Sequence, residues 1–167
     1  MREIALSRGL VALVDDADYE RVSEFKWFAL PSQGLRARGI GTYYATRQFH
    51  SPRRTVSLHR FILGLGAGTP IVDHVDGDGL NNQRANLRTC TNGQNTANGR
   101  YVRNRTGFRG VFELDGRFWA QIDFHGNRRR VGPFSDAATA AHAYDVEAVT
   151  LFGDFARPNF PRQEQAA

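Results

Sequence analysis

The sequence predicts an α+β protein, in which short strands form antiparallel hairpins and one longer helix covers a sheet. Three observations support this fold class. Short β-rich runs separated by turn residues fill the N-terminal third of the chain. The dipeptides Asp115–Gly116 and Gly126–Asn127, both typical of hairpin turns, divide a later region into three strands. The alanine-rich segment 135–153 follows, with Ser135 as a candidate helix cap and Gly153 at its end.

Residues 1–66 are expected to form short strands and one helix. The stretch EIALSRGLVALV has a Ser-Arg-Gly turn between two apolar runs, which favours a hairpin. The stretch DDADYERVSEF begins with capping acids and spaces Tyr19, Val22 and Phe25 like one face of a helix. The runs KWFAL, TYYATRQF and TVSLHRFIL are rich in β-formers or ambiguous between strand and helix.

Residues 71–98 have the pattern of a β-hairpin followed by a helix. PIVDH is a short apolar strand ending in Asp73 and His74, DGDGLNN is rich in turn residues, and LRTCT is a second short strand. NGQNTAN can begin a helix with Thr91 or Asn92 as its cap. This pattern places His74 at the end of a strand and Asn95 on the helix.

The composition is that of an ordinary globular protein of 167 residues, long enough for one domain or two small ones. No run approaches the ~18 apolar residues that a membrane span needs, and the acids near the N-terminus do not fit a signal peptide. The single cysteine, Cys90, excludes an intramolecular disulfide and a cysteine-rich zinc site. A reducing, cytoplasmic setting is therefore expected.

Basic charge gathers in two blocks around the polar hairpin segment. Residues 31–72 carry six arginines and no acid, and residues 100–130 carry eight arginines and three acids. The segment between them, 73–99, has two bases and three acids. Clustered basic charge is the electrostatic footprint of a nucleic-acid partner, so a nucleic acid is the expected partner and a plain solvated surface is the less favoured alternative.

The residues of the hairpin segment suit phosphodiester hydrolysis. This reaction needs an activated water and a cation for the leaving oxygen. A neutral imidazole such as that of His74 can take the proton of the water. Asp73 and Asn95 offer the hard oxygen ligands that Mg²⁺ and similar ions accept. Asn86 can accept a hydrogen bond from the other imidazole nitrogen and so fix the tautomer.

The stretch DHVDGDGLNNQRANLRTCTNGQN resembles the HNH nuclease motif, in the histidine-asparagine-asparagine form of phage and intron homing endonucleases. With SLHRFILG upstream, the resemblance covers about residues 1–98 and implies a ββα-metal nuclease module. It implies that His74 is the general base, that Asp73 and Asn95 bind one divalent metal, with Mg²⁺ the expected ion, and that Asn86 orients the base.

Other polar residues of this region have simpler explanations. The residues of Asp76–Gly79 are expected to make turns, and Asn81 and Asn82 are expected to cap or turn the loop. His59 is expected to be structural or to contact a backbone phosphate, with a role as a second catalytic base as the alternative.

Residues 106–160 resemble the apetala/ethylene-response-factor DNA-binding domain. The shared features are RGV, an A-x-I strand, the segment from GNR to GPF, the helix with AHAYD, and the terminal NF. The resemblance implies a three-stranded antiparallel sheet that lies in the DNA major groove, with one helix packed behind it. Strand alternation directs Phe118, Ala120, Ile122 and Phe124 to the helix, and Trp119, Gln121 and Asp123 to the outer face.

The expected DNA contacts lie on that outer face and in the preceding linker. Arginines there can fork onto guanine or clamp a phosphate. For Trp119, a half-buried sheet residue is an equal alternative. Phe112, Asp123 and Arg130 depart from residues frequent in the plant factors, so the base preference of those factors does not transfer. The candidate contacts are Arg103, Arg105, Arg109, Trp119, Gln121, Arg128 and Arg130.

Together these features predict a metal-dependent endonuclease of homing or phage type that acts on double-stranded DNA. The enzyme is expected to work as a monomer or weak dimer in the cytoplasm of a bacterial or phage-infected cell. No small-molecule cofactor is expected. A DNA-binding regulator with an inactive nuclease module is the alternative, and an RNA-directed nuclease is a second one. The predicted parts are the nuclease module 1–98, a basic linker 99–105, the DNA-binding domain 106–160 and a tail 161–167.

Overall fold

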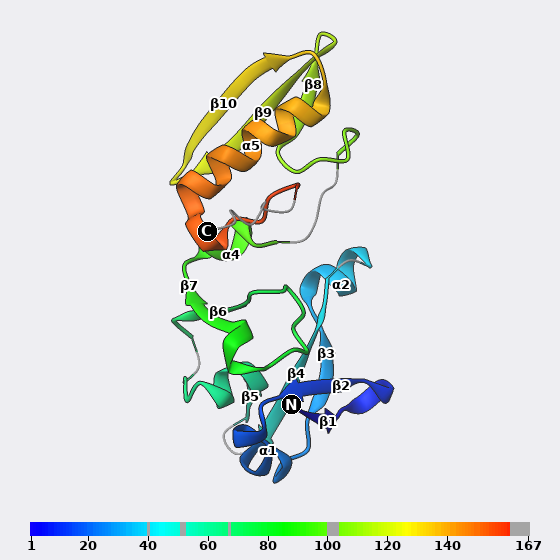
Figure 1. Cartoon of the computed structure of the whole chain (residues 1–167). Helices are drawn as coiled ribbons and strands as arrows, with labels where there is room; N and C mark the ends of the chain where they lie inside the picture. The colour runs from blue at the N-terminus through cyan, green and yellow to red at the C-terminus, as the bar shows by residue number, and fades with distance from the viewer. Residues whose placement is uncertain (40, 51–52, 67, 100–103, 161–167) are drawn as a thin grey trace. The chain divides into compact units, whose positions relative to one another are not determined.

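A computed structural model of the chain describes residues 1–39, 41–50, 53–66, 68–99 and 104–160 (Figure 1). The chain divides into two compact units, Met1–Thr91 and Asn92–Ala167. Small antiparallel sheets and helices make up both units, so the predicted α+β class is confirmed. The compact units separate after Thr91, whereas the predicted nuclease module runs through residue 98, and the module boundaries stay a prediction. None of the described helices is both long and apolar enough to cross a membrane.

The first unit contains three antiparallel sheets and three short α-helices within its described residues. A hairpin of β1 and β2 and a three-stranded sheet of order β3-β4-β5 precede the hairpin of β6 and β7. The ambiguous run TVSLHRFIL is half strand and half helix, since β5 ends where α3 begins. The elements are β1 (Arg2–Ala5), η1 (Ser7–Gly9), β2 (Val11–Val14), α1 (Asp16–Ser23), β3 (Phe28–Pro31), α2 (Gln33–Arg38), β4 (Tyr43–His50), β5 (Arg53–Ser57), α3 (Leu58–Ile62), β6 (Ile71–His74), η2 (Arg84–Asn86) and β7 (Leu87–Cys90).

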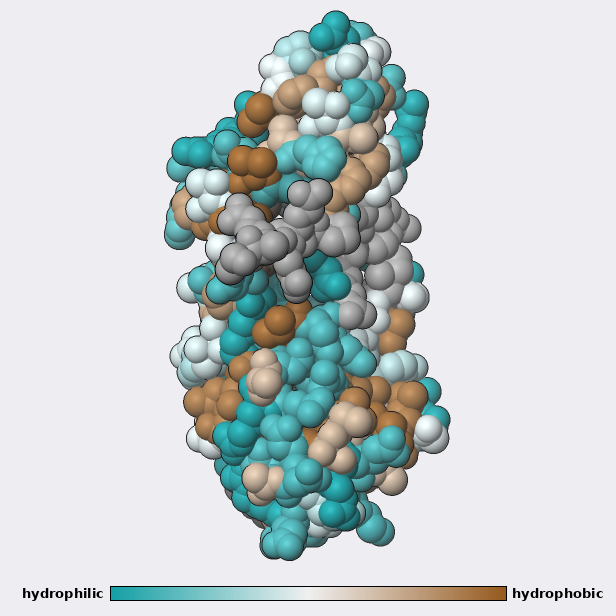
Figure 2. Space-filling view, in the orientation of Figure 1, coloured by the Kyte–Doolittle hydropathy of each residue, from teal (hydrophilic) through white to brown (hydrophobic). Residues whose placement is uncertain are grey.

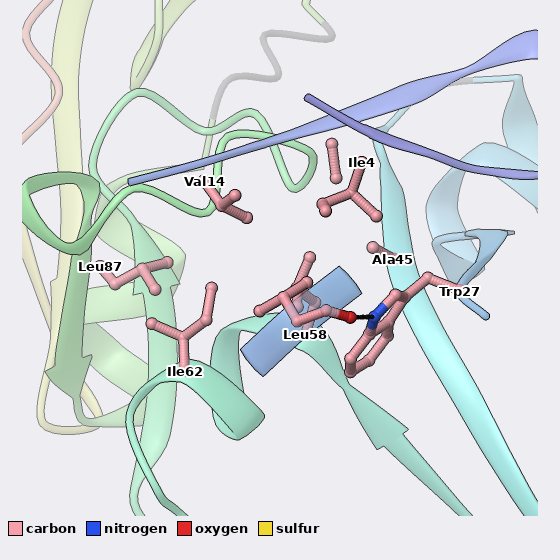
Figure 3. Packing of buried hydrophobic residues seen from close by; sticks show 9 residues of the cluster. Ile4, Val14, Trp27, Ala45, Leu58, Ile62 and Leu87 are labelled. Atoms are coloured by element: carbon pink, nitrogen blue, oxygen red, sulfur yellow. Dashed lines mark hydrogen bonds between the residues drawn. The ribbon is translucent and has the colours of Figure 1, made fainter. Parts of the chain in front are cut away.

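A single apolar cluster joins these sheets and helices (Figure 3). Leu58 and Ile62 of α3 are fully buried beside Trp27, whose indole nitrogen donates to the Val22 carbonyl at 2.9 Å. Leu87 brings the start of β7 into the same cluster. Hydrophilic residues cover much of the central part of the visible face of this unit (Figure 2). The β6–β7 hairpin is therefore anchored to the core at one end, next to Asp73 and His74.

The long loop between β6 and β7 is tied to the rest of the unit by backbone and side-chain bonds. Leu13 of β2 bridges to Asn81, and Asn82 N donates to the Leu13 carbonyl at 2.8 Å. Arg84 in η2 forks onto the buried carboxylate of Asp18 in α1, with Nε and Nη2 at 2.7 and 2.8 Å. Residues 81–84 of the loop are thus tied to β2 and α1, although the loop contains many turn residues.

The second unit is a three-stranded sheet of order β10-β9-β8 with α5 packed on one face (Figure 1). Alanines at 140, 141 and 148 and Tyr144 let α5 approach the sheet closely. The short α4 packs against α5 and η3. The elements are α4 (Asn92–Ala97), β8 (Val111–Leu114), β9 (Arg117–Phe124), β10 (Asn127–Phe134), α5 (Ala137–Phe152) and η3 (Gly153–Phe155).

Two local predictions for this unit were displaced by one residue. The second hairpin turn is His125–Gly126, because Phe124 pairs with Asn127 and both turn residues have positive φ, 49° and 78°. The helix cap is Asp136 rather than Ser135, since the Asp136 carboxylate accepts from Thr139 N at 2.8 Å. The turn at Asp115–Gly116 is confirmed by the pairing of Leu114 with Arg117.

Candidate active site at the end of a β-hairpin

Asp73 and His74 are the last two residues of β6, and both side chains are buried. The exposed fraction is 6% for Asp73 and 4% for His74. They pair across the hairpin with Arg88 and Leu87, respectively. Successive strand residues point to opposite faces, so the carboxylate and the imidazole leave the strand in different directions.

Arg88 neutralises the buried carboxylate of Asp73. Its Nε and Nη2 atoms donate to Asp73 Oδ2 at 3.0 and 2.9 Å. A buried carboxylate needs such a cation, because desolvation without a partner is strongly unfavourable. Asp73 thus offers oxygen atoms of the hard type that divalent ions accept, and Arg88 already occupies one of them.

The His74 imidazole lies in a cluster of three rings. Its centroid is 5.1 Å from that of His59 in α3 and 5.8 Å from that of Tyr44 in β4, and Tyr44 and His59 are 5.9 Å apart. Gly79 permits this arrangement, since a Cβ atom there would lie 2.6 Å from the Tyr44 ring. Sequence reasoning missed Tyr44, because nothing in a β-rich run distinguishes one tyrosine from its neighbour Tyr43.

Burial keeps the imidazoles neutral. Desolvation lowers the pKa of His74, although the Asn82 side chain and the carboxylates of Asp76, Asp73 and Asp78 partly oppose this shift. Desolvation, followed by the positive charge of His74 and Arg60, lowers the pKa of His59 to about 3. Neutral imidazole is the form that accepts a proton, so His74 is in the state that a general base requires.

Tyr44 is held in its phenol form by the same surroundings. Burial raises the pKa of Tyr44, and the negative charge of Asp73 raises it further. Tyr44 thus links the ring cluster electrostatically to the carboxylate that precedes His74.

Asn86 is hydrogen-bonded within the loop that follows β6. Its Oδ1 accepts from Asp76 N at 2.9 Å, and its Nδ2 donates to Asp76 Oδ1 and to the Asn81 carbonyl at 3.0 and 2.8 Å. These three bonds fix the conformation of the loop that follows His74. The predicted role of Asn86 in orienting the base stays a prediction.

Asn82 is the amide that interacts with His74. It is fully buried, and its Nδ2 donates to the Leu80 carbonyl at 3.0 Å. Within the described part of the chain its Oδ1 has no hydrogen-bond partner of ordinary geometry. The Asn82 side chain nevertheless lies close enough to His74 to oppose the lowering of the His74 pKa. The sequence assigned Asn82 to the turn, and the only signal for this role was the doubling of asparagine at 81–82.

The loop acid Asp76 organises the same segment. Its carboxylate accepts from Asp78 N and from the Asn81 and Asn86 amides, at 2.8 to 3.0 Å. Burial acts to raise the pKa of Asp76, but these hydrogen bonds outweigh burial and hold the pKa below its usual value. Asp76 is a loop-building residue, as the sequence predicted.

Asn95, the second predicted metal ligand, is exposed on α4 in the second compact unit. Asp73, His74 and Asn86 all belong to the first unit. Among the described residues no group of three or more His, Cys, Asp or Glu side chains is placed to hold a metal ion. The pairing of Asp73 with Asn95 stays a prediction.

The outer face of the second unit presents most of the predicted DNA-contacting residues. Arg128 is exposed and pairs with Asp123 at 2.9 Å, and Arg130 donates to Gln121 at 3.1 Å. Trp119 is half-buried beside Gly132, which agrees with the predicted alternative of a half-buried sheet residue. Phe118, Ala120, Ile122 and Phe124 contact α5 or residues packed with it, so the predicted alternation is confirmed.

Arg109 does not lie on that outer face, and its predicted placement is wrong. It precedes β8, and its Nη1 donates to the Ala97 carbonyl at the end of α4 at 3.2 Å, while the guanidinium interacts with the Tyr144 hydroxyl on α5. Arg109 lies in a turn before β8, so strand alternation does not direct its side chain, which contacts α4 and α5 instead. Arg105 is 95% exposed, and Arg103 lies outside the described residues.

The motif residues that suggested the second domain build its frame. Asn159 accepts from Arg109 N at 2.6 Å and donates to the Arg109 carbonyl, and Asp145 accepts from the backbone of Asn159 and Phe160. The AYD and NF segments thus hold the RGV turn in place.

Comparison with known proteins decides the family. Over 157 aligned residues the chain is 31% identical to an uncharacterized HNH endonuclease of Acanthamoeba polyphaga mimivirus, and the alignment spans 91% of this chain and 76% of that protein. The chain belongs to the HNH endonuclease family. No family model and no solved structure matches the chain.

Membership of the HNH endonuclease family confirms the prediction that this protein is an enzyme, a nuclease. The motif residues Asp73 and His74 form the buried pair at the end of β6, and their roles as metal ligand and general base stay predictions. The resemblance of residues 106–160 to a DNA-binding domain stays a prediction.

Proposed function

We propose that this HNH endonuclease is a metal-dependent DNA hydrolase of homing or phage type, which cuts phosphodiester bonds near a site selected by its C-terminal domain. The observation that carries the proposal is the buried Asp73–His74 pair, where a neutral imidazole follows a carboxylate at the end of a strand. A general base and a hard oxygen donor are the two groups that the reaction needs.

In this mechanism His74 takes a proton from the attacking water at an imidazole nitrogen while the water oxygen bonds to phosphorus and the bond to the leaving oxygen breaks. Asn82 and the rings of Tyr44 and His59 keep the imidazole in place. Asp73 and Asn95 would hold one divalent ion such as Mg²⁺, which supplies positive charge for the leaving oxygen. Asn86 and Asp76 keep the loop after His74 in one conformation.

The outer sheet face of the second unit is proposed to read DNA. Its exposed Arg128 forms a surface ion pair with Asp123, and exposed pairs of this kind contribute little to stability. A phosphate or a guanine edge can therefore replace the carboxylate at small cost. Trp119 and Gln121 lie on the same sheet face as Arg128 and Arg130. Arg105, in the segment before this sheet, supplies a phosphate contact without sequence specificity.

The proposed division of labour assigns catalysis to residues 1–98 and site selection to residues 106–160, with the basic segment 99–105 between them. The relative of similar sequence is a viral protein, which supports a mobile, virus-borne origin. A monomer or weak dimer is the proposed working form.

The experiment is cleavage of duplex DNA from the genomic region that flanks the gene, with purified protein, in Mg²⁺ and in EDTA. We expect cutting in Mg²⁺ and none in EDTA. Retention of the DNA without cutting, in gel-shift assays at the same protein concentration, would instead favour a regulator whose nuclease module is inactive. Cleavage of the RNA copy at an equal rate would favour the RNA-directed alternative.

A further inference from the structure

Arg88 binds the carboxylate that the proposed function assigns to the metal. Its Nε and Nη2 atoms both donate to Asp73 Oδ2, at 3.0 and 2.9 Å. The two residues face each other across β6 and β7, so the pairing is built into the register of the hairpin. The exposed side-chain fraction is 18% for Arg88 and 7% for Asp73, which makes this a largely desolvated ion pair.

A divalent ion and this guanidinium compete for the same oxygen. Both carry positive charge, and at a few ångströms in a poorly solvated site their repulsion is substantial. Asp73 cannot lose its cation without cost, because an uncompensated buried carboxylate is strongly destabilised. Cation exchange at Oδ2 keeps the carboxylate neutralised in both states.

A phosphate group gives the displaced guanidinium a second partner. The planar fork of arginine matches phosphate oxygens as well as carboxylate oxygens. DNA is the substrate under the proposed function, so a scissile phosphate would arrive beside the same strand end as the metal. The guanidinium then has somewhere to go when the metal takes Oδ2.

We propose that Arg88 is an exchangeable cation of the active site, which occupies Asp73 in the free enzyme and passes to the substrate phosphate when the metal binds. This inference rests on the proposed function, since it takes Asp73 to be a metal ligand. Arg88 then contacts the substrate phosphate and couples metal binding to DNA binding: metal binds weakly to the free enzyme and more tightly once DNA is present.

The Asp18–Arg84 pair supplies a matched control. Arg84 also forks onto a buried carboxylate in the same unit, with its Nε 2.7 Å from Asp18 Oδ2. That pair joins α1 to the loop, and its carboxylate is not a predicted metal ligand. A purely structural arginine at 88 would behave like Arg84.

The experiment measures Mn²⁺ binding to the full-length protein without DNA, by electron paramagnetic resonance, for wild type, Arg88→Met, Arg88→Lys and Arg84→Met. We expect Arg88→Met to bind Mn²⁺ at least about tenfold more tightly than wild type, Arg88→Lys to show a smaller gain of the same sign, and Arg84→Met to show no gain. Circular dichroism establishes that each variant is folded. If Arg88→Met does not fold, Arg88→Lys still tests the proposal. Lysine keeps the positive charge but loses the planar guanidinium, so the affinity for Mn²⁺ should rise by less than in Arg88→Met.

A second titration adds a duplex oligonucleotide in a His74→Ala background, where cleavage is suppressed. DNA should tighten Mn²⁺ binding with Arg88 present, and this tightening should shrink at least about tenfold with Arg88→Met. Equal or weaker Mn²⁺ binding by Arg88→Met in free protein, or an equal gain in Arg84→Met, overturns the proposal. Absence of DNA cleavage by the wild type in Mg²⁺ overturns the proposed function instead, and that result comes from a separate assay.

Discussion

The rings of His59 and His74 lie edge to face, with 5.1 Å between their centroids and 88° between their planes. The arrangement brings α3 against the end of β6, although 14 residues separate His59 from His74 in the sequence. Because desolvation lowers the pKa of His59 to about 3, this ring stays uncharged near neutral pH. It can therefore support His74 without repelling a proton from it.

His59→Gln should retain cleavage within about tenfold of wild type, with an unchanged shape of the pH–rate profile between pH 5 and 9. A base whose pKa is about 3 is mostly unprotonated but too weak to accept a proton efficiently near pH 7. The measurement is single-turnover cleavage across this pH range. Loss of one limb of the profile in His59→Gln would identify His59 as a second catalytic base.

Asn86→Ala should lower the free energy of unfolding by about 1–3 kcal/mol, because it removes three hydrogen bonds to part-buried groups of the loop. Asn81→Ala, which removes the amide bonded to Asp76 Oδ2 at 2.8 Å, is the matched control and should cost less. Urea denaturation at equilibrium measures both. An Asn86→Ala variant as stable as wild type but inactive would return Asn86 to direct contact with the base.

Asp18 should make the fold sensitive to acid. Hydrogen bonds from Arg84, and to a smaller extent from Arg21, hold the pKa of Asp18 below its usual value despite desolvation. Because the unfolded chain then binds this proton more readily than the folded one, the carboxylate stabilises the fold above about pH 4, and this contribution is lost as pH falls through the lowered pKa.

Between pH 5 and pH 3 the wild type should therefore lose more free energy of unfolding than Asp18→Asn does, as measured by urea denaturation at both values. Asp16→Asn, at an exposed acid that pairs with the N-terminal amine, is the control and should follow the wild type. Parallel losses in wild type and Asp18→Asn would show that the Asp18 pair does not govern acid stability.

Arg128→Ala should relax the preference for particular cleavage sites, since each good base contact discriminates by about 1–3 kcal/mol. Arg105→Ala should instead weaken binding to all sequences and flatten its salt dependence.

Arg109→Ala should chiefly lower the melting temperature, because Arg109 ties the turn before β8 to α4. Cleavage-site mapping, binding at several salt concentrations and thermal melting separate the three. Unaltered site preference in Arg128→Ala would remove the outer sheet face from recognition.

Patterns of local sequence predicted the strands and the long helix well. Turn dipeptides and alternation depend on neighbouring residues, so the sheet of β8, β9 and β10 and its two faces followed from the sequence. The errors were of one residue, at the Asp136 cap and the His125 turn, where neighbouring polar residues compete for one role.

Contacts between distant segments escaped prediction. Spacing alone could not reveal that Tyr44 and His59 flank His74, that the Asn82 side chain interacts with the imidazole, or that Arg88 holds Asp73. Each depends on the packing of separate strands and loops. Arg109 illustrates the same limit, because its direction is set by α4 and α5 and not by strand alternation.

The most direct test of the central claim, that Asp73 and His74 form the nuclease centre, is the single-turnover rate of DNA cleavage at saturating protein in Mg²⁺. His74→Ala should reduce this rate by ~10²–10⁴-fold, the usual contribution of general base catalysis, while DNA affinity in a gel-shift assay stays at the wild-type level. Asp73→Ala should raise the Mg²⁺ concentration needed for cleavage or abolish activity. A His74→Ala protein that cuts DNA at nearly the wild-type rate would contradict the account.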